Sequence, residues 1–145
     1  MAFTKETLDK LTLQILDKLA LFLQNKKYTV VCEPHWDCIL IVFENGQEKF
    51  SMQRSFNAGR HWVHIMIPNE DKISIENSKL STNLYTKANH LYVTLGNIYT
   101  KQEEARKEAE KEKNEQKLKE AHQSYLSAEH KKQTQILDKL NAYLK

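Results

Sequence analysis

Residues 38–54 read CILIVFENGQEKFSMQR and contain the strongest local structural signal in the chain. Two runs rich in apolar and aromatic residues flank Asn45-Gly46, a dipeptide typical of a type I′ turn, in which both central residues need a positive φ. The stretch therefore predicts a β-hairpin. Because Ile39 to Phe43 is continuously apolar, we expect this strand to be central in a sheet and covered on both faces.

The segments around this hairpin also have the composition of strands. Tyr28 to Cys32 and His61 to Ile67 are rich in Val, Ile, Tyr and Trp, and a turn over Ser55 to Gly59 precedes the second of them. Ile73 to Glu76 predicts a short edge strand. Side chains alternate across a strand, so residues 61–67 should divide between two faces. These are His61, Val63, Ile65 and Ile67 on one face, and Trp62, His64 and Met66 on the other.

Two helices are expected on either side of the strands. Thr4 to Lys27 places its apolar residues in one broad stripe, with Thr4 as the N-cap. Beyond residue 77 the spacing four, three, four, three indicates the seam of a coiled coil or of a helix lying on a sheet. This seam consists of Leu84, Ala88, Leu91, Leu95 and Ile98. We predict an α+β domain over residues 1–100, with an antiparallel sheet of three to five strands packed by both helices.

The predicted helices carry more apolar surface than one small sheet would cover. Leu13 and Leu21 lie off the stripe of the first helix, and the second helix has the seam described above. We therefore expect a homodimer. In the order of its elements, the domain resembles small dimeric chaperone-type domains of bacterial secretion systems, a resemblance that rests on no motif and implies no function.

Residues 101–145 form a second part of different composition. They hold 20 of the 41 charged residues and neither Gly nor Pro, and residues 101–123 mix Lys and Glu as in an exposed helix held by i,i+4 ion pairs. We predict an extended charged helical arm, as one straight helix or as a hairpin, with an amphipathic tip. The apolar residues of the tip are Ile136, Leu137, Leu140, Tyr143 and Leu144.

The tip also contains an internal repeat. Gln14 to Leu19 recurs residue for residue as Gln135 to Leu140. One interpretation is convergent patterning, because amphipathic helices use few residue types. The other is that both helices present one kind of apolar ridge to similar grooves, in a dimer or on another protein.

Composition argues against several classes of protein. A net charge of +3 is too small to argue for nucleic-acid binding by itself. The chain lacks the run of about 18 apolar residues that a membrane span needs, and its N-terminus lacks the apolar run of a signal peptide. We expect no membrane association and a cytoplasmic location, with Cys32 and Cys38 as ordinary strand residues without a disulfide.

Motifs for catalysis and cofactor binding are missing from the sequence. Three scattered glycines cannot form a phosphate loop, so no cofactor is predicted. Cys32, His35 and Cys38, with His61 and His64 downstream, do not have the spacing of a zinc site, and we predict no metal. An enzyme that uses Cys38 with His35, His61 or His64 remains as an alternative, because catalytic groups can assemble in space.

The leading hypothesis is a non-enzymatic protein-binding module, such as an adaptor, a chaperone or an inhibitor of the kind that phages and mobile elements carry. Trp and Arg are enriched at interface hot spots. A nucleic-acid-associated protein using Lys26, Lys27, Arg54, Arg60 and the basic side of the arm is the first alternative. Residues 1–100 hold 11 basic and 10 acidic residues, which favours a protein partner. Besides the tip, the candidate partner-binding residues are Trp36, Arg54, Phe56, Arg60, Trp62 and His64. The alternative for Trp36 and Trp62 is a place in the core, which is the more common position of a tryptophan.

Overall fold

The computed structural model describes residues 3–144, which form two helices and five strands. The chain divides into two compact units, Met1–Glu103 and Glu104–Lys145. The elements are α1 (Lys5–Asn25), β1 (Thr29–Glu33), β2 (Ile39–Glu44), β3 (Gln47–Asn57), β4 (Arg60–Met66), β5 (Ile73–Glu76) and α2 (Thr82–Tyr143). The five strands pair in sequence order as one antiparallel sheet, which confirms the α+β prediction.

Two tight turns set the register of the central strands. Asn45 and Gly46 have φ of 53° and 78°, as the predicted type I′ turn requires. Ala58 and Gly59 adopt a similar pair of positive φ angles, 51° and 79°. The predicted turn over Ser55 to Gly59 is therefore too long, because a two-residue turn at Ala58-Gly59 leaves Ser55 free to pair with Trp62 in the β3–β4 hairpin.

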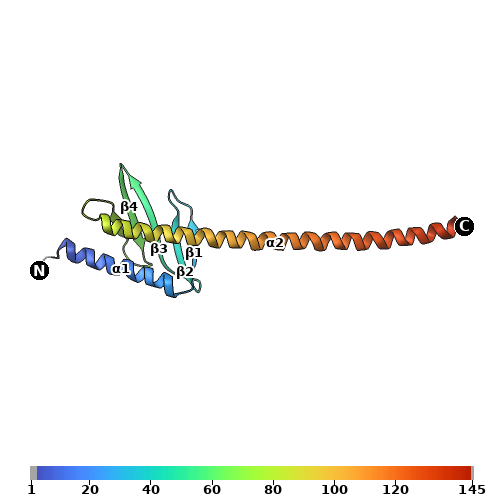
Figure 1. Cartoon of the computed structure of the whole chain (residues 1–145), viewed down its shortest axis with the longest axis horizontal. Coiled ribbons are helices and arrows are strands. Elements are labelled where there is room, and N and C mark those ends of the chain that lie inside the picture. The colour runs from blue at the N-terminus through green and yellow to red at the C-terminus, as the bar shows by residue number, and fades with distance from the viewer. Residues whose placement is uncertain (1–2, 145) are drawn as a thin grey trace. The chain divides into compact units, whose positions relative to one another are not determined.

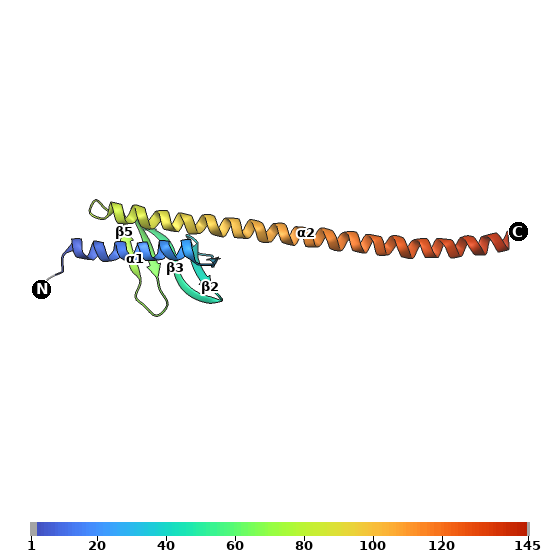
Figure 2. The same cartoon turned by 60° about the horizontal axis from the view of Figure 1, so that its bottom comes forward.

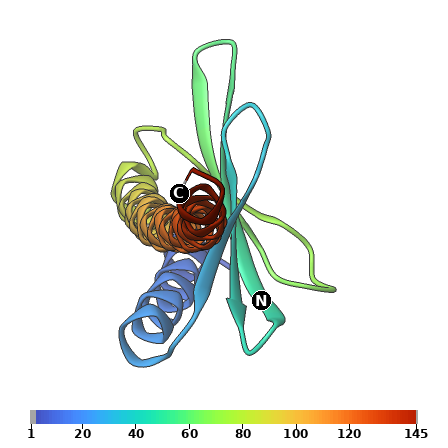
Figure 3. The ribbon, with the colours of Figure 1, turned by 90° about the vertical axis from the view of Figure 1, so that its right-hand side faces the viewer.

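Both helices of the first unit cover the same face of the sheet. Figures 1 and 2 show α1 and the beginning of α2 side by side, and Figure 3 shows both on one side of the strands. The alternation predicted in β4 is confirmed, with Val63 and Ile65 buried under the helices. The prediction for β2 is wrong in one respect, because only its Leu40 and Val42 face the helices while Ile41 lies on the open face.

Helix α1 begins and packs largely as its sequence predicts. The Oγ1 atom of Thr4, the N-cap, accepts a hydrogen bond from the Thr7 amide at 3.2 Å. Leu16 is buried, and Phe22 packs edge-on against Phe50 of β3. The N-terminal part of the predicted stripe, from Leu8 to Leu11, remains exposed.

The seam predicted after residue 77 is a helix lying on a sheet. Ala88, Leu91 and Leu95 of α2 are buried in the core of the first unit, and Leu84 and Ile98 pack against that core. This surface is used within the chain, so it no longer supports the predicted homodimer.

Gln102 closes the free edge of the sheet at β1. Its Oε1 accepts a hydrogen bond from the Val30 amide at 2.9 Å, and its Nε2 donates to the Tyr28 carbonyl at 3.4 Å. The side-chain amide thus pairs with the strand as a neighbouring strand would. Capping an edge in this way removes backbone groups that could pair with another chain.

The second unit consists of the remainder of α2. All of residues 104–143 are helical, so the helical-hairpin alternative is wrong, and nearly all of their side chains are exposed. Arg106 and Glu110 form one of the expected i,i+4 ion pairs at 3.4 Å. Within residues 3–144, neither helix contains an apolar stretch long enough to cross a bilayer.

Candidate partner-binding site

The loop between β1 and β2 is closed by a disulfide. Cys32 of β1 and Cys38, the residue before β2, are bonded, with their Cα atoms 5.7 Å apart. The prediction that they are ordinary strand residues without a disulfide is therefore wrong. They were expected on separate strands, and these strands prove to be neighbours in an antiparallel pair, which brings the two side chains together.

Two side chains hold this loop against the rest of the first unit. The hydroxyl of Tyr92 on α2 donates a hydrogen bond to the Cys38 carbonyl at 2.7 Å, and burial raises the pKa of Tyr92. The Arg54 guanidinium lies 4.6 Å from the centre of the Tyr92 ring. Its Nε is 3.4 Å from an Asp37 carboxylate oxygen, without the geometry of a hydrogen bond, and its Nη1 donates to Asn89 at 3.4 Å. Arg54 of β3 therefore lies between Asp37 of the loop and Asn89 and Tyr92 of α2.

Trp36 lies at the exposed position of this loop. Its side chain is 81% exposed, and its ring stacks on Phe56 of β3 with centroids 6.4 Å apart. Phe56 in turn contacts His61 of β4, 4.8 Å away. Figure 3 shows why these residues meet: the β1–β2 loop and the β3–β4 hairpin extend at the same end of the sheet. We call Trp36, Phe56 and His61 the aromatic cluster.

Arg60 and Trp62 belong to a separate group on the open face of the sheet. Arg60 donates two hydrogen bonds to Glu76 of β5, at 2.6 and 3.0 Å, and its guanidinium lies 4.9 Å from the centre of the Trp62 ring. The hydrogen bonds raise the pKa of Arg60 and lower that of Glu76. One edge of the guanidinium, Nε with Nη2, thus holds both carboxylate oxygens of Glu76, and Trp62 is only partly exposed.

His64 is a buried member of the open face. Its Nε2 is 2.6 Å from the Ser55 hydroxyl and its Nδ1 is 2.8 Å from the Ser74 hydroxyl. Burial, with a smaller effect of Lys72, lowers the pKa of His64. The residue is only 9% exposed, so among the candidate partner-binding residues it is the one that the structure buries.

The structure does not bring Cys38 and His64 together, as one form of the enzyme alternative would require. The Cys38 sulfur is in the disulfide, and His64 lies on the opposite face of the sheet, bonded to the two serines. His35 Nδ1 accepts a hydrogen bond from the Trp36 amide at 2.8 Å. Within residues 3–144, no three His, Cys, Asp or Glu side chains are close enough together to hold a metal ion.

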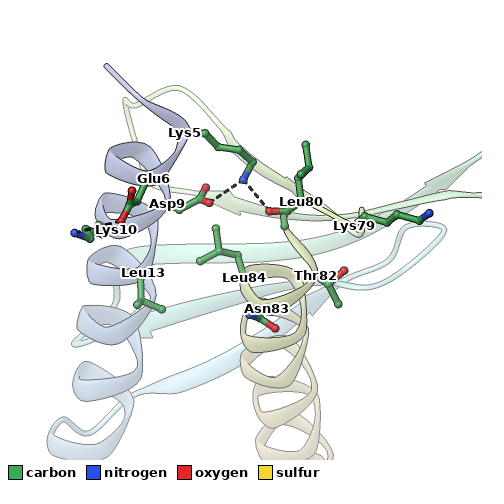
Figure 4. Close-up of a pocket in the computed structure, with 11 residues that line it drawn as sticks. Lys5, Glu6, Asp9, Lys10, Leu13, Lys79, Leu80, Thr82, Asn83 and Leu84 are labelled. Carbon is green, nitrogen blue, oxygen red and sulfur yellow. Dashed lines mark hydrogen bonds and ion pairs between the residues drawn. The ribbon is translucent and has the colours of Figure 1, made fainter. Parts of the chain in front are cut away.

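A groove lies where α1 and α2 begin, away from the candidate partner-binding residues (Figure 4). Lys5 Nζ crosses it, donating to Asp9 at 2.7 Å and to the Leu80 carbonyl at 2.9 Å. Leu13 and Leu84 also line it. Its charged groups largely pair with one another, and we assign it no ligand.

The apolar residues predicted at the tip of the arm are all exposed. Ile136, Leu140 and Tyr143 line one side of a shallow groove on the helix surface, and Leu137 lies beside them. Leu144, at the end of the described chain, is also exposed. These residues belong to the second unit, so they form a candidate surface separate from the aromatic cluster.

Several residues of the site were not predicted. Tyr92 and Asn89 join Arg54, and Glu76 joins Arg60, although nothing in their local sequence indicates these partners. Comparison with protein-family models, with curated proteins and with solved structures gives no match.

Proposed function

We propose that this chain is a non-enzymatic protein-binding module of the adaptor, chaperone or inhibitor type, and that its binding site centres on Trp36. The observation that carries the proposal is the exposure of this tryptophan, 81%, on a loop that the Tyr92 hydroxyl anchors through the Cys38 carbonyl. Large aromatic side chains are normally buried to a high degree, and tryptophan is the residue most enriched at binding hot spots.

The anchoring of the loop adds to this argument. Tyr92 and Arg54 hold Cys38 and Asp37 at the β2 end of the loop, and Phe56 stacks on the Trp36 ring. A side chain already held in place loses less conformational entropy when a partner covers it. The partner that fits such a surface offers an apolar pocket or cleft for the indole, rimmed by hydrogen-bonding groups.

The arginines favour a protein partner over nucleic acid. Arg60 holds Glu76 through two hydrogen bonds, and Arg54 contacts Asp37 and Asn89. A guanidinium engaged by a carboxylate in this way is less available to phosphate, on which nucleic-acid affinity depends.

Affinity capture from the native host tests the proposal. Wild-type protein should retain a specific partner, W36A should lose it, and the matched control L80A, which truncates another highly exposed side chain, should retain it. Truncation of a hot-spot tryptophan should weaken binding by at least about 2 kcal/mol, or about thirtyfold. Capture of the same proteins by W36A, with unchanged affinity, would refute the proposal, whereas binding that falls steeply with salt would favour nucleic acid.

We propose a cytoplasmic location as well, and the disulfide provides its test. Disulfides are uncommon in reducing cytosol, so a cytoplasmic chain should carry Cys32 and Cys38 as thiols, with Tyr92 still anchoring the loop. Alkylation of thiols in intact cells, followed by mass spectrometry, distinguishes the two forms. Recovery of the Cys32–Cys38 disulfide from freshly trapped cells would contradict this location.

A further inference from the structure

An apolar stripe runs along the second half of the arm. At about 100° per residue, Leu118, Tyr125, Ile136 and Tyr143 lie within about 20° of one line on the helix surface. All four are between 46 and 87% exposed. Ala121 and Leu140 flank this line on its two sides, at the edges of the same stripe. A helix in water with such a stripe has an apolar face without a partner.

Two opposite charges interrupt the stripe near its middle. Glu129 and Lys132 lie within about 40° of the same line, between Tyr125 and Ile136. Glu129 is partly buried on its own helix, where it accepts a hydrogen bond from Gln133 at 3.0 Å. The stripe thus has mainly apolar ends, with His122 and Lys139 at its edges, and a centre with one acidic and one basic residue.

This arrangement matches a second copy of itself in antiparallel orientation. A two-fold axis between His130 and Lys131 places each residue of the stripe opposite the residue that is equally far on the other side of the axis. Apolar residues then face apolar residues, and the acid faces the base. The facing pairs are Leu118 with Tyr143, Tyr125 with Ile136, Ala121 with Leu140, and Glu129 with Lys132.

The parallel arrangement lacks this complementarity. In a parallel, in-register pair, each residue of the stripe lies next to the same residue of the other copy, so Glu129 would meet Glu129 and Lys132 would meet Lys132. Like charges that face each other in this way are destabilising. Charge therefore selects the antiparallel orientation.

We propose that residues 118–143 bind the same segment of a second copy as an antiparallel helix pair. This inference goes beyond the proposed function, because the aromatic cluster lies in the other unit. It also moves the dimer surface away from Leu84–Ile98, which packs on the sheet. The identity of Gln135–Leu140 with Gln14–Leu19 then reflects shared amphipathic patterning. The competing interpretation is that the tip takes the place of α1 on the core of a second copy.

Charge exchange in the full-length chain tests the register. Sedimentation equilibrium should show a concentration-dependent dimer for wild type. E129K and K132E should each weaken it about tenfold or more, because each turns two symmetry-related attractions into repulsions. The double variant E129K/K132E should restore the wild-type dissociation constant, and a mixture of the two single variants should form heterodimers. K131E, a reversal on the opposite side of the helix, is the matched control and should leave dimerisation unchanged.

Three results would overturn the proposal. The first is a monomer at all concentrations up to about 100 μM, well above the micromolar range of ordinary specific association. The second is a dimer that neither single variant weakens, which would place the interface elsewhere, for example where α1 packs on the core. The third is a double variant as weak as the single variants. Because W36A should leave this dimer intact, the proposed function and the helix pair can fail independently.

Discussion

Trp36 and His64 were both candidate partner-binding residues, but one is exposed and the other is buried. Trp36 extends from a loop into solvent, whereas His64 is enclosed on the open face by two serine hydroxyls. The period of two in β4 correctly assigns His64 to the face opposite Val63. It does not show that Ser55 and Ser74 come from neighbouring strands to satisfy both ring nitrogens.

His64→Gln tests this residue by its pH dependence. At pH 7.5 the variant should lose about 1–3 kcal/mol of unfolding free energy, because buried hydroxyls lose partners. Folding lowers the pKa of His64 below its ordinary value of about 6.5, so the unfolded chain binds the proton more readily. The wild type should therefore lose stability as the pH falls below about 6.5, and the difference from the variant should shrink.

Urea unfolding at pH 7.5 and at pH 5.5 measures that difference. His130→Gln, on the exposed arm, is the control and should match the wild type at both values. A gap between wild type and His64→Gln that stays constant with pH would mean that folding does not disfavour protonation of His64.

At the scale of elements, the Cys32–Cys38 disulfide of the β1–β2 loop should contribute to the stability of the oxidised chain. Closing a loop of this length should stabilise the fold by about 2 kcal/mol, through the entropy of the unfolded chain. Reductant should therefore lower the urea midpoint of the oxidised wild type. It should have no effect on the double variant Cys32→Ser/Cys38→Ser, and equal sensitivity of both proteins would contradict the assignment.

The edge of β1 depends on a single side chain of α2. Gln102→Leu removes both hydrogen bonds to the strand and should cost about 1 kcal/mol. The Val30 amide should then exchange its hydrogen faster, as NMR can measure. Gln116→Leu, on the arm, is the matched control. Unchanged protection of Val30 in Gln102→Leu would show that the side chain does not close the edge.

At the scale of the whole molecule, stability should reside in the first unit. Every residue of the core, from Leu16 to Leu95, lies before residue 104. A chain ending at Glu103 should therefore keep the near-ultraviolet circular dichroism of its aromatic residues, and its unfolding free energy should change by less than about 0.5 kcal/mol. A truncated chain that unfolds would show that the arm contributes to folding.

Local signals in the sequence account for the elements themselves. Asn45-Gly46 specifies its turn through positive φ angles, Thr4 caps α1 through its hydroxyl, and the 3.6-residue period of Leu84–Ile98 identifies a helix with one apolar face. Each depends on residues a few positions apart, so each can be predicted from the chain. The exposed tip of the arm was predicted in the same way.

Long-range contacts account for what could not be predicted. The stretch Ile39–Phe43 is equally apolar whether one or two faces are covered, and only the placement of both helices on one side leaves Ile41 on the open face. Cys32 and Cys38 meet because β1 and β2 pair, and Trp36 is exposed because Tyr92, 54 residues beyond Cys38, holds its loop. Local preferences specified the helices, strands and turns, whereas burial, pairing and exposure arose only when distant segments came together.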